Sequence, residues 1–320
     1  MEIILTKQQI RQAVAEAYDE CRNINEGHNA DYIPYLANID PSLFGLSVVL
    51  LDGTIISVGD CDYEFGIESV SKVFTAILAL KQYGQEAVIN KLCANATGMP
   101  FNSVFAILLE NEQPSTPLVN AGAISACSMI RPIGDEQGKW DAIISNINEL
   151  SGAPCHVIDE LYKSESDTNF NNRAIAWLLK NYNRIHDDVT MSLDLYTRQC
   201  SVATTSNRLA ICAATIANQG INPVTHHAVF PAEISPKITT MIASVGFYET
   251  TGDWMFTSGL PAKSGVGGGV MGVLPGVFGI AAFAPPLDHA GNSLRGQTAL
   301  RSVMKKLGLG IFNGNNIRIQ

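Results

Sequence analysis

The sequence has 320 residues and a mass of 34.4 kDa, with 46% hydrophobic and 16% charged residues. The length exceeds the usual ~100–200 residues per domain and predicts two lobes or one large α/β unit, while the composition excludes collagen-like, disulfide-scaffold and disordered chains. Because 30 Asp and Glu outnumber 21 Lys and Arg, the formal charge is −9, which disfavours binding to nucleic acids and to anionic membranes.

The N-terminal part of the chain predicts one helix and one hairpin. Apolar residues recur at helical spacing between Thr6 and Tyr18, and threonine is a favoured N-cap, so we expect an amphipathic helix here. Two β-rich runs, 44–51 and 54–58, flank Asp52-Gly53. An Asp-Gly pair between such runs predicts an antiparallel hairpin.

The middle of the chain, from Glu68 to about Ile216, has helical patterning. The best segments are 71–80, 119–130, 140–150, 171–179 and 208–216. We therefore expect a helical lobe of about 68–216, inserted into a sheet lobe formed by about 1–67 and 217–320.

The C-terminal part returns to a β pattern after Gly246. The runs 265–274 and 277–283 flank Pro275-Gly276 and predict a glycine-rich hairpin. A final helix at about 297–307 is expected to end at Gly308. Both ends of the chain thus contribute to one sheet lobe of an α/β (α+β) fold.

Several patterns argue against cofactors, metals and secretion. The glycine-rich match at 267–272 runs into a turn and a second strand rather than a helix, which excludes a dinucleotide loop. The six histidines show no metal-ligand spacing, and the adjacent His226 and His227 are expected in a loop. Seven scattered cysteines predict reduced thiols. With no signal peptide and no membrane-length apolar run, we expect a cytoplasmic protein without a metal, cofactor, nucleic-acid or membrane partner.

Ser69 and Lys72 are the first candidates for catalysis. Three residues apart at the start of a helix, they share one face, so the amine can reach the hydroxyl. The same spacing occurs at Ser302 and Lys305, inside the last predicted helix, so spacing alone decides nothing. Ser69 differs because it follows Gly66 at a strand-to-helix junction, where a hydroxyl can project into a cleft.

Lys263-Ser264-Gly265, at the head of the glycine-rich strand, adds a second element. A lysine there is expected to place a positive charge over a cleft, and the glycines let backbone N–H groups approach an oxyanion. The alternative is a surface lysine before a bulged strand. Together, the two motifs match the serine β-lactamase and penicillin-binding architecture in order and in the element each occupies.

The third triplet of that architecture, Ser-Asp-Asn or Tyr-x-Asn in the helical lobe, is missing, which argues against a β-lactam enzyme. Longer segments from about Ala30 to Gly308 closely resemble the serine-dependent glutaminases instead. The resemblance rests on residues 30–34, 117–124, 196–201, 259–266, 285–288 and 291–293. It implies a β-lactamase/transpeptidase-like fold, with a mostly antiparallel sheet flanked by helices, and hydrolysis of L-glutamine to L-glutamate and ammonia.

The resemblance also implies catalytic roles. Ser69 is expected to attack the side-chain amide carbon and Lys72 to help carry the proton, while Tyr248 acts first as base and then as acid. The backbone N–H groups of Ser69 and Val266 would form the oxyanion hole. A neutral lysine requires its pKa to fall by roughly three units, or about 4 kcal/mol, and we expect burial and the Lys263 charge to cause this shift.

Around the substrate, the resemblance implies Glu165 as partner of the α-ammonium. Asn172 lies seven residues later, on the same face if the segment is helical throughout. The neutral donors are Asn120, Asn172, Tyr196 and Tyr32. From the residues alone, ordinary alternatives remain open: a helix cap for Asn120, loop or surface positions for Asn172 and Tyr32, a solvated acid for Glu165 and a core position for Tyr196.

Glu68 departs from the family pattern, because many glutaminases have Gln before the nucleophile. A carboxylate here would compete with the substrate carboxylate or titrate in a functional pH range. Two rival functions remain: a peptidase or β-lactamase of the same fold, and a non-catalytic amino-acid-binding protein. The resemblance also implies a homo-oligomer, either a dimer or a tetramer.

Overall fold

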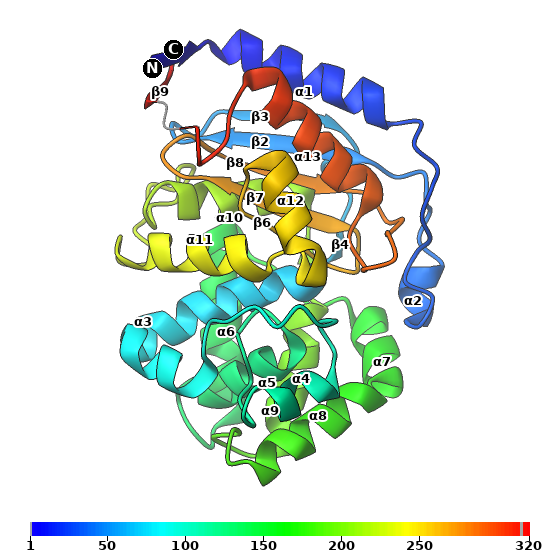
Figure 1. Cartoon of the computed structure of the whole chain (residues 1–320), viewed down its shortest axis with the longest axis vertical. Helices are drawn as coiled ribbons and strands as arrows, with labels where there is room; N and C mark the ends of the chain where they lie inside the picture. Colours follow the sequence, from blue (N-terminus) through cyan, green and yellow to red (C-terminus); the bar gives the residue numbers. More distant parts are fainter. Residues whose placement is uncertain (1, 314–315) are drawn as a thin grey trace.

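The computed structural model describes residues 2–313 and 316–320 (Figure 1). Within these residues, a five-stranded antiparallel sheet has the order β3-β2-β8-β7-β6. Its strands are β2 (Gly45–Leu50), β3 (Ile55–Gly59), β6 (Ala262–Ser264), β7 (Gly269–Leu274) and β8 (Phe278–Phe283). Both predicted hairpins, β2/β3 and β7/β8, are present, and the central β2–β8 pairing joins the two ends of the chain as expected.

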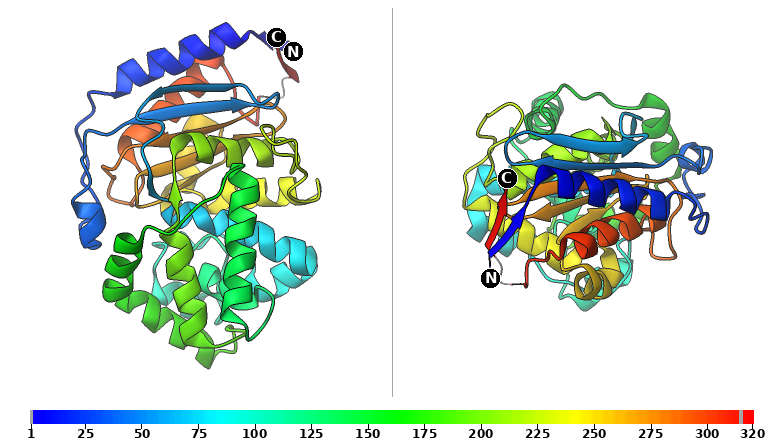
Figure 2. Two further views of the ribbon diagram at one scale, coloured as in Figure 1. Left: turned by 180° about the vertical axis from the view of Figure 1, so that it is seen from behind. Right: turned by 90° about the horizontal axis from the view of Figure 1, so that it is seen from above.

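Helices cover both faces of the sheet (Figure 2). On one face, α1 (Lys7–Cys21) packs against α13 (Leu294–Leu307), and on the other lies α10 (Ser206–Ala217). The predicted ends are confirmed: Thr6 and Gln9 form a reciprocal capping box before α1, and Gly308, with φ of 64°, ends α13. Near the termini, β1 (Glu2–Leu5) pairs in parallel with β9 (Asn316–Ile319).

The helical insertion lies below the sheet in Figure 1 and follows a short two-residue strand, β4 (Phe65–Gly66). Its helices are η1 (Glu68–Val70), α3 (Ser71–Leu92), α4 (Val104–Leu109), α5 (Asn120–Met129), α6 (Glu136–Ser151), α7 (Asp159–Thr168), α8 (Phe170–Asn181) and α9 (Val189–Cys200). The chain leaves through β5 (Ala203–Thr204), which pairs with β4. No helix in the described ranges combines the length and the apolar character needed to cross a membrane.

The expected boundary of the helical lobe at about 216 differs from the structure. Helix α10 packs against β8, β2 and β7, so it belongs to the sheet side and the insertion ends before it. The reason is close contact between backbones: a Cβ on Gly279 of β8 would lie 2.1 Å from the backbone nitrogen of Ala214. Helices α11 (Ile234–Val245) and α12 (Thr251–Ser258) then lead back to β6.

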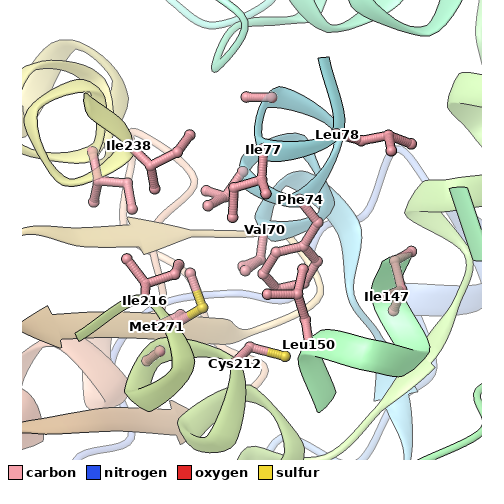
Figure 3. Close-up of a cluster of buried hydrophobic side chains, with 14 of the residues drawn as sticks. Val70, Phe74, Ile77, Leu78, Ile147, Leu150, Cys212, Ile216, Ile238 and Met271 are labelled. Carbon is pink, nitrogen blue, oxygen red and sulfur yellow. The ribbon is translucent and has the colours of Figure 1, made fainter. Parts of the chain in front are cut away.

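A buried apolar cluster fixes α3 between the sheet and the insertion (Figure 3). Val70 precedes α3, and Phe74 and Ile77 lie on it, all with 0% exposure. They belong to one cluster with residues of α6, α10, α11 and β7, namely Ile147, Leu150, Cys212, Ile216, Ile238 and Met271. Because this core immobilises the first turns of α3, it also fixes the position of Ser69, immediately before them.

Replacing Gly279 with alanine is expected to destabilise the protein by about 3 kcal/mol or more. The new methyl group would meet the α10 backbone, which cannot move aside as a flexible side chain could. Chemical denaturation measures the change. Gly252→Ala in α12 is the control, because its added Cβ meets nothing within 4 Å and alanine favours the helix. Equal stability of the two variants would contradict the proposed tight packing.

Candidate active site

Ser69 lies where β4 gives way to α3, the strand-to-helix junction that the sequence predicts. The turn is tight: a Cβ on Gly66 would lie 2.2 Å from Leu161 Cδ2, and Glu68 adopts a left-handed φ of 51°. Such a conformation is uncommon for a residue other than glycine and often marks a functional turn. It presents Ser69 at the start of a fixed helix, with 5% of its surface exposed.

Lys72 lies one turn after Ser69 and contacts it directly. Its Nζ donates to Ser69 Oγ at 2.9 Å and to Asn120 Oδ1 at 2.6 Å. Burial lowers the pKa of Lys72 to about 8, because an apolar environment disfavours the charged amine. A substantial share of the amine is therefore neutral near pH 8, and it lies within hydrogen-bond reach of the hydroxyl.

Asn120 connects Lys72 to two other predicted residues. It is the first residue of α5, but its side chain does not cap that helix. Instead its Oδ1 accepts from the Tyr196 hydroxyl at 3.1 Å, and its Nδ2 donates to Asn172 Oδ1 at 2.8 Å. Tyr196 is 3% exposed, so it is buried as a core residue would be and still offers its hydroxyl to the site.

Tyr248 lies near Ser69, which opposes the rise in the pKa of the phenol. It begins η2 (Tyr248–Thr250) with φ of 54° and donates its hydroxyl to the Ser264 carbonyl at 3.1 Å. Its ring lies 4.5 Å from that of Phe101 between centroids. Burial raises the pKa of Tyr248, so the phenol keeps its proton at neutral pH.

The sequence predicts that Lys263 extends over an open cleft, and this prediction is wrong. The side chain is fully buried, with Nζ 4.1 Å from the centroid of the Tyr248 ring and 2.5 Å from the Ser264 carbonyl oxygen. Burial and the nearby Lys72 lower the pKa of Lys263 well below its usual range. Burial and the charge of Lys263 were both expected to lower the pKa of Lys72. Burial does so, whereas the repulsion between the two lysines lowers the pKa of Lys263 instead.

The glycine-rich segment passes close to the Ser69 backbone. A Cβ on Gly265 would lie 3.1 Å from the Ile67 carbonyl oxygen and 3.3 Å from the Ser69 nitrogen. The next residue, Val266, lines the same pocket as Ser69. This places the backbone segments of the two predicted oxyanion donors side by side.

Ser69 lines a pocket with a volume of about 120 Å³. This is far below the ~300–1,000 Å³ of sites for drug-sized ligands, so the pocket suits a small molecule. Its lining brings together eight of the nine residues expected around the substrate: Tyr32, Glu68, Ser69, Asn120, Glu165, Asn172, Tyr196 and Val266. The ninth, Tyr248, is not among the lining residues and packs behind them against Phe101, which lines the pocket. Tyr32 stays 55% exposed, whereas Glu165 is 8% exposed and is not a solvated surface acid.

The segment carrying Glu165 and Asn172 is not one continuous helix. Helix α7 ends at Thr168 and α8 begins at Phe170, with Asn169 between them at ψ of 35°. The seven-residue spacing therefore does not place the two side chains on one helical face. They reach the same pocket because the chain turns at Asn169, whose side chain donates to Thr197 Oγ1 at 3.3 Å.

Phe101 and Cys200 also line the pocket and were not predicted. The Phe101 ring packs against that of Tyr248 at an interplanar angle of 37°, and its centroid lies 5.6 Å from Lys72 Nζ. Cys200 follows Tyr196 by four residues, and that helical spacing puts both on one face of α9, a signal that could have identified it.

Glu68, Glu165 and Cys200 place one ligand-type atom each within 4.8 Å of one another. Burial raises the pKa values of Glu68 and Cys200 well above their usual range. Metal ligands must be deprotonated, whereas these groups favour their protonated forms, so we assign no metal to this trio.

The chain matches known glutaminases over nearly its whole length. A model of the glutaminase family matches residues 27–312. Glutaminases of Bacteroides thetaiotaomicron and Parabacteroides distasonis are 66% and 64% identical to it, over 98% of this chain and 98% of their own. Glutaminase 1 of Escherichia coli K12 is 47% identical over 97% of this chain and 100% of its own.

Solved structures agree with this match. The probable glutaminase ybaS superimposes with a TM-score of 0.95 at 46% identity, covering 97% of this chain and 100% of that one. Native Mglu superimposes with a TM-score of 0.90 at 33% identity, covering 95% of this chain and 74% of that one. A probable glutaminase of Bacillus subtilis superimposes with a TM-score of 0.86 at 29% identity, covering 95% of this chain and 97% of that one. The β-lactamase-like fold expected from sequence is confirmed, and the chain belongs to the glutaminase family.

Proposed function

We propose that the protein hydrolyses the side-chain amide of L-glutamine to L-glutamate and ammonia through an ester on Ser69. The observation that carries this proposal is the 2.9 Å contact between Lys72 Nζ and Ser69 Oγ at the edge of a small polar pocket. Family membership supports glutamine as the substrate. The geometry supports the route, because an amine of lowered pKa adjoins the hydroxyl that must lose a proton.

In the first step, Ser69 Oγ attacks the amide carbon and its proton passes to neutral Lys72. The carbonyl oxygen gains negative charge, which the N–H groups of Ser69 and Val266 stabilise. The C–N bond then breaks, and the nitrogen leaves as ammonia after receiving a proton. Since burial raises the pKa of Tyr248, we assign this residue to proton donation rather than to the role of first base.

In the second step, water attacks the glutamyl ester. Before this step, the proton that Lys72 took from Ser69 replaces the one that Tyr248 gave to the leaving nitrogen, so the amine is neutral again. Lys72 then takes a proton from the water, the ester C–O bond breaks, and Ser69 recovers a proton from Lys72. Glu165 receives the α-ammonium of the substrate, and the neutral side chains of Asn120, Asn172, Tyr196 and Tyr32 orient the remaining polar groups. Lys263 touches no pocket surface; we propose that it positions the Tyr248 ring.

Ammonia production tests the proposed function. The purified protein is expected to release ammonia from L-glutamine far faster than from asparagine or glutathione. The two rivals predict other outcomes: labelling by a fluorescent penicillin for a β-lactamase or peptidase, and glutamine binding without ammonia for a sensor. Either result in place of ammonia release would overturn the proposal.

Replacing Tyr248 with phenylalanine is expected to lower kcat about 10²–10⁴-fold and to change KM less. The ring and its contact with Phe101 are kept, whereas the phenolic proton is lost. Steady-state kinetics with glutamine measure the change. Tyr83→Phe is the matched control, since the Tyr83 hydroxyl also donates to a backbone carbonyl, that of Met129, away from the pocket. Equal kcat in both variants would remove Tyr248 from proton transfer.

We further propose a cytoplasmic location and a homo-oligomer. Within the described residues all seven cysteines are free, which fits a reducing compartment. Exposed apolar side chains such as Phe105 and Leu109 of α4 and Trp177 of α8 offer area for contact with a second copy. Light scattering on the purified protein tests the assembly, and a monomer at all concentrations would contradict it.

A further inference from the structure

Glu68 and Glu165 form a buried pair of carboxyl groups in the pocket wall. They come from η1 and α7, far apart in the chain, and are 3% and 8% exposed. One carboxyl oxygen of each lies within 4.8 Å of a carboxyl oxygen of the other. Two charged carboxylates this close in a buried site repel each other, so one of them is expected to keep a proton, and only the protonated one can donate a hydrogen bond to the other.

The proton is best placed on Glu68. Its Oε1 is buried and has no hydrogen-bond partner among the described residues, and a bare carboxylate oxygen in that position would be costly. Burial, followed by the charge of Glu165, raises the pKa of Glu68 well above its usual range. The pKa of Glu165 is also raised by burial, but the bond from Glu68 and the charge of Lys72 oppose that rise.

The other titratable groups around Glu68 and Glu165 do not supply enough positive charge to let both carboxyl groups ionise. Lys72 lies on α3, Cys200 and Tyr196 on α9, Tyr248 on η2 and Tyr32 before α2 (Pro34–Ala37). Burial raises the pKa values of the Cys200 thiol and of the Tyr196 and Tyr248 phenols, which therefore stay neutral. Lys72 is the one cation among these groups.

We propose that Glu68 and Glu165 share one proton, and that the pocket accepts glutamine only while Glu68 holds it. This proposal rests on the proposed function. When the α-ammonium contacts the Glu165 carboxylate, the Glu68 O–H becomes free to donate to the α-carboxylate of the substrate. A charged Glu68 would instead repel that carboxylate, so Glu68 selects the zwitterionic amino acid through its own protonation state.

This arrangement makes substrate affinity depend on pH in two steps, because a pair of coupled carboxyl groups has two pKa values. Between these values Glu68 is neutral and Glu165 is charged, and the affinity for glutamine is constant. Below the lower value Glu165 is protonated and no longer attracts the α-ammonium. Above the upper value Glu68 ionises, the competent fraction falls tenfold per pH unit, and the apparent Kd rises by the same factor.

The test uses the full chain with Ser69→Ala, which binds glutamine without consuming it. Calorimetric titration with L-glutamine is carried out from acidic to alkaline pH, in two buffers of different ionisation enthalpy at each pH. We expect Kd to rise about tenfold per pH unit at the alkaline end, with uptake approaching one proton for each glutamine bound. Adding Glu68→Gln is expected to remove the part of both effects that Glu68 causes, because the amide cannot ionise, and to leave only the part caused by loss of a proton from the α-ammonium of free glutamine.

Controls separate the possible causes. Because the charge of Glu68 also acts on the pKa of Lys72, the comparison is made with Lys72→Met in both proteins, which removes any proton that Lys72 takes up. Glu160→Gln, an exposed change on the same helix as Glu165, is expected to leave the pH dependence in place. Identical proton uptake with and without Glu68→Gln would overturn the shared proton. If Glu68→Gln does not fold, absence of proton uptake by the Ser69→Ala protein alone overturns it.

Failure of the proposed function gives a different result. In that case the intact protein releases no ammonia from glutamine at any pH, and the Ser69→Ala protein gives no binding heat with glutamine. A protein that releases ammonia but binds glutamine with the same Kd at every pH overturns only the role of Glu68.

Discussion

Replacing Ser69 with alanine is expected to lower ammonia release from glutamine by a factor of about 10⁴ or more. The hydroxyl is the only atom of this side chain that can form the ester, and loss of a nucleophile removes the whole covalent route. Initial rates at saturating glutamine measure the effect. Thermal unfolding should change little, because the substitution removes one oxygen from a pocket surface.

The chain contains a matched control for this variant. Ser302 and Lys305 repeat the serine–lysine spacing within α13, where the Ser302 hydroxyl donates to Glu20 at 2.6 Å, away from the pocket. Ser302→Ala is expected to keep the turnover of the original protein. Comparable losses in the two variants would mean that the serine–lysine pair at α3 is not special, and the proposed route would fail.

Replacing Lys72 with methionine is expected to lower kcat about 10²–10⁴-fold and to remove the acidic side of its pH profile. In the original protein the base is the neutral amine, and burial lowers the pKa of Lys72 to about 8. Below that pH the amine is charged, so kcat should fall about tenfold per pH unit; above it, kcat should level off. Methionine keeps the unbranched stem and cannot take a proton.

Lys305→Met tests whether losing any lysine has the same effect. This side chain is exposed on α13, and its removal should leave both kcat and the midpoint near pH 8 unchanged. A Lys72→Met protein that retained the same pH profile would assign the titration to another group.

Short-range signals explain why most of the fold could be predicted. The cap at Thr6, the Asp52-Gly53 turn and the Pro275-Gly276 turn each depend on a few neighbouring residues. Chain order then indicated that both ends build one sheet, and the β2–β8 pairing agrees. The resemblance to glutaminases supplied what local pattern could not, namely which polar residues meet at the pocket.

Contacts between distant segments explain what could not be predicted. The α10 sequence is apolar enough to pack against either the sheet or other helices. Its position against the sheet depends on the close approach to Gly279 of β8, a contact that exists only in the folded protein. A polar run around Asn169 is compatible with one helix or with two. Lys263 of β6 contacts the ring of Tyr248 of η2, and the Tyr248 hydroxyl donates to the next residue of β6, Ser264. The spacing of residues within either segment does not indicate this contact.

The most direct test of the central claim is mass spectrometry of the intact protein, quenched in acid during turnover of glutamine and then digested. The account predicts an adduct with the mass of one glutamyl group on the peptide containing Ser69, and no adduct in the Ser69→Ala variant. Steady ammonia release with the adduct on another residue, or undiminished release by Ser69→Ala, would contradict it.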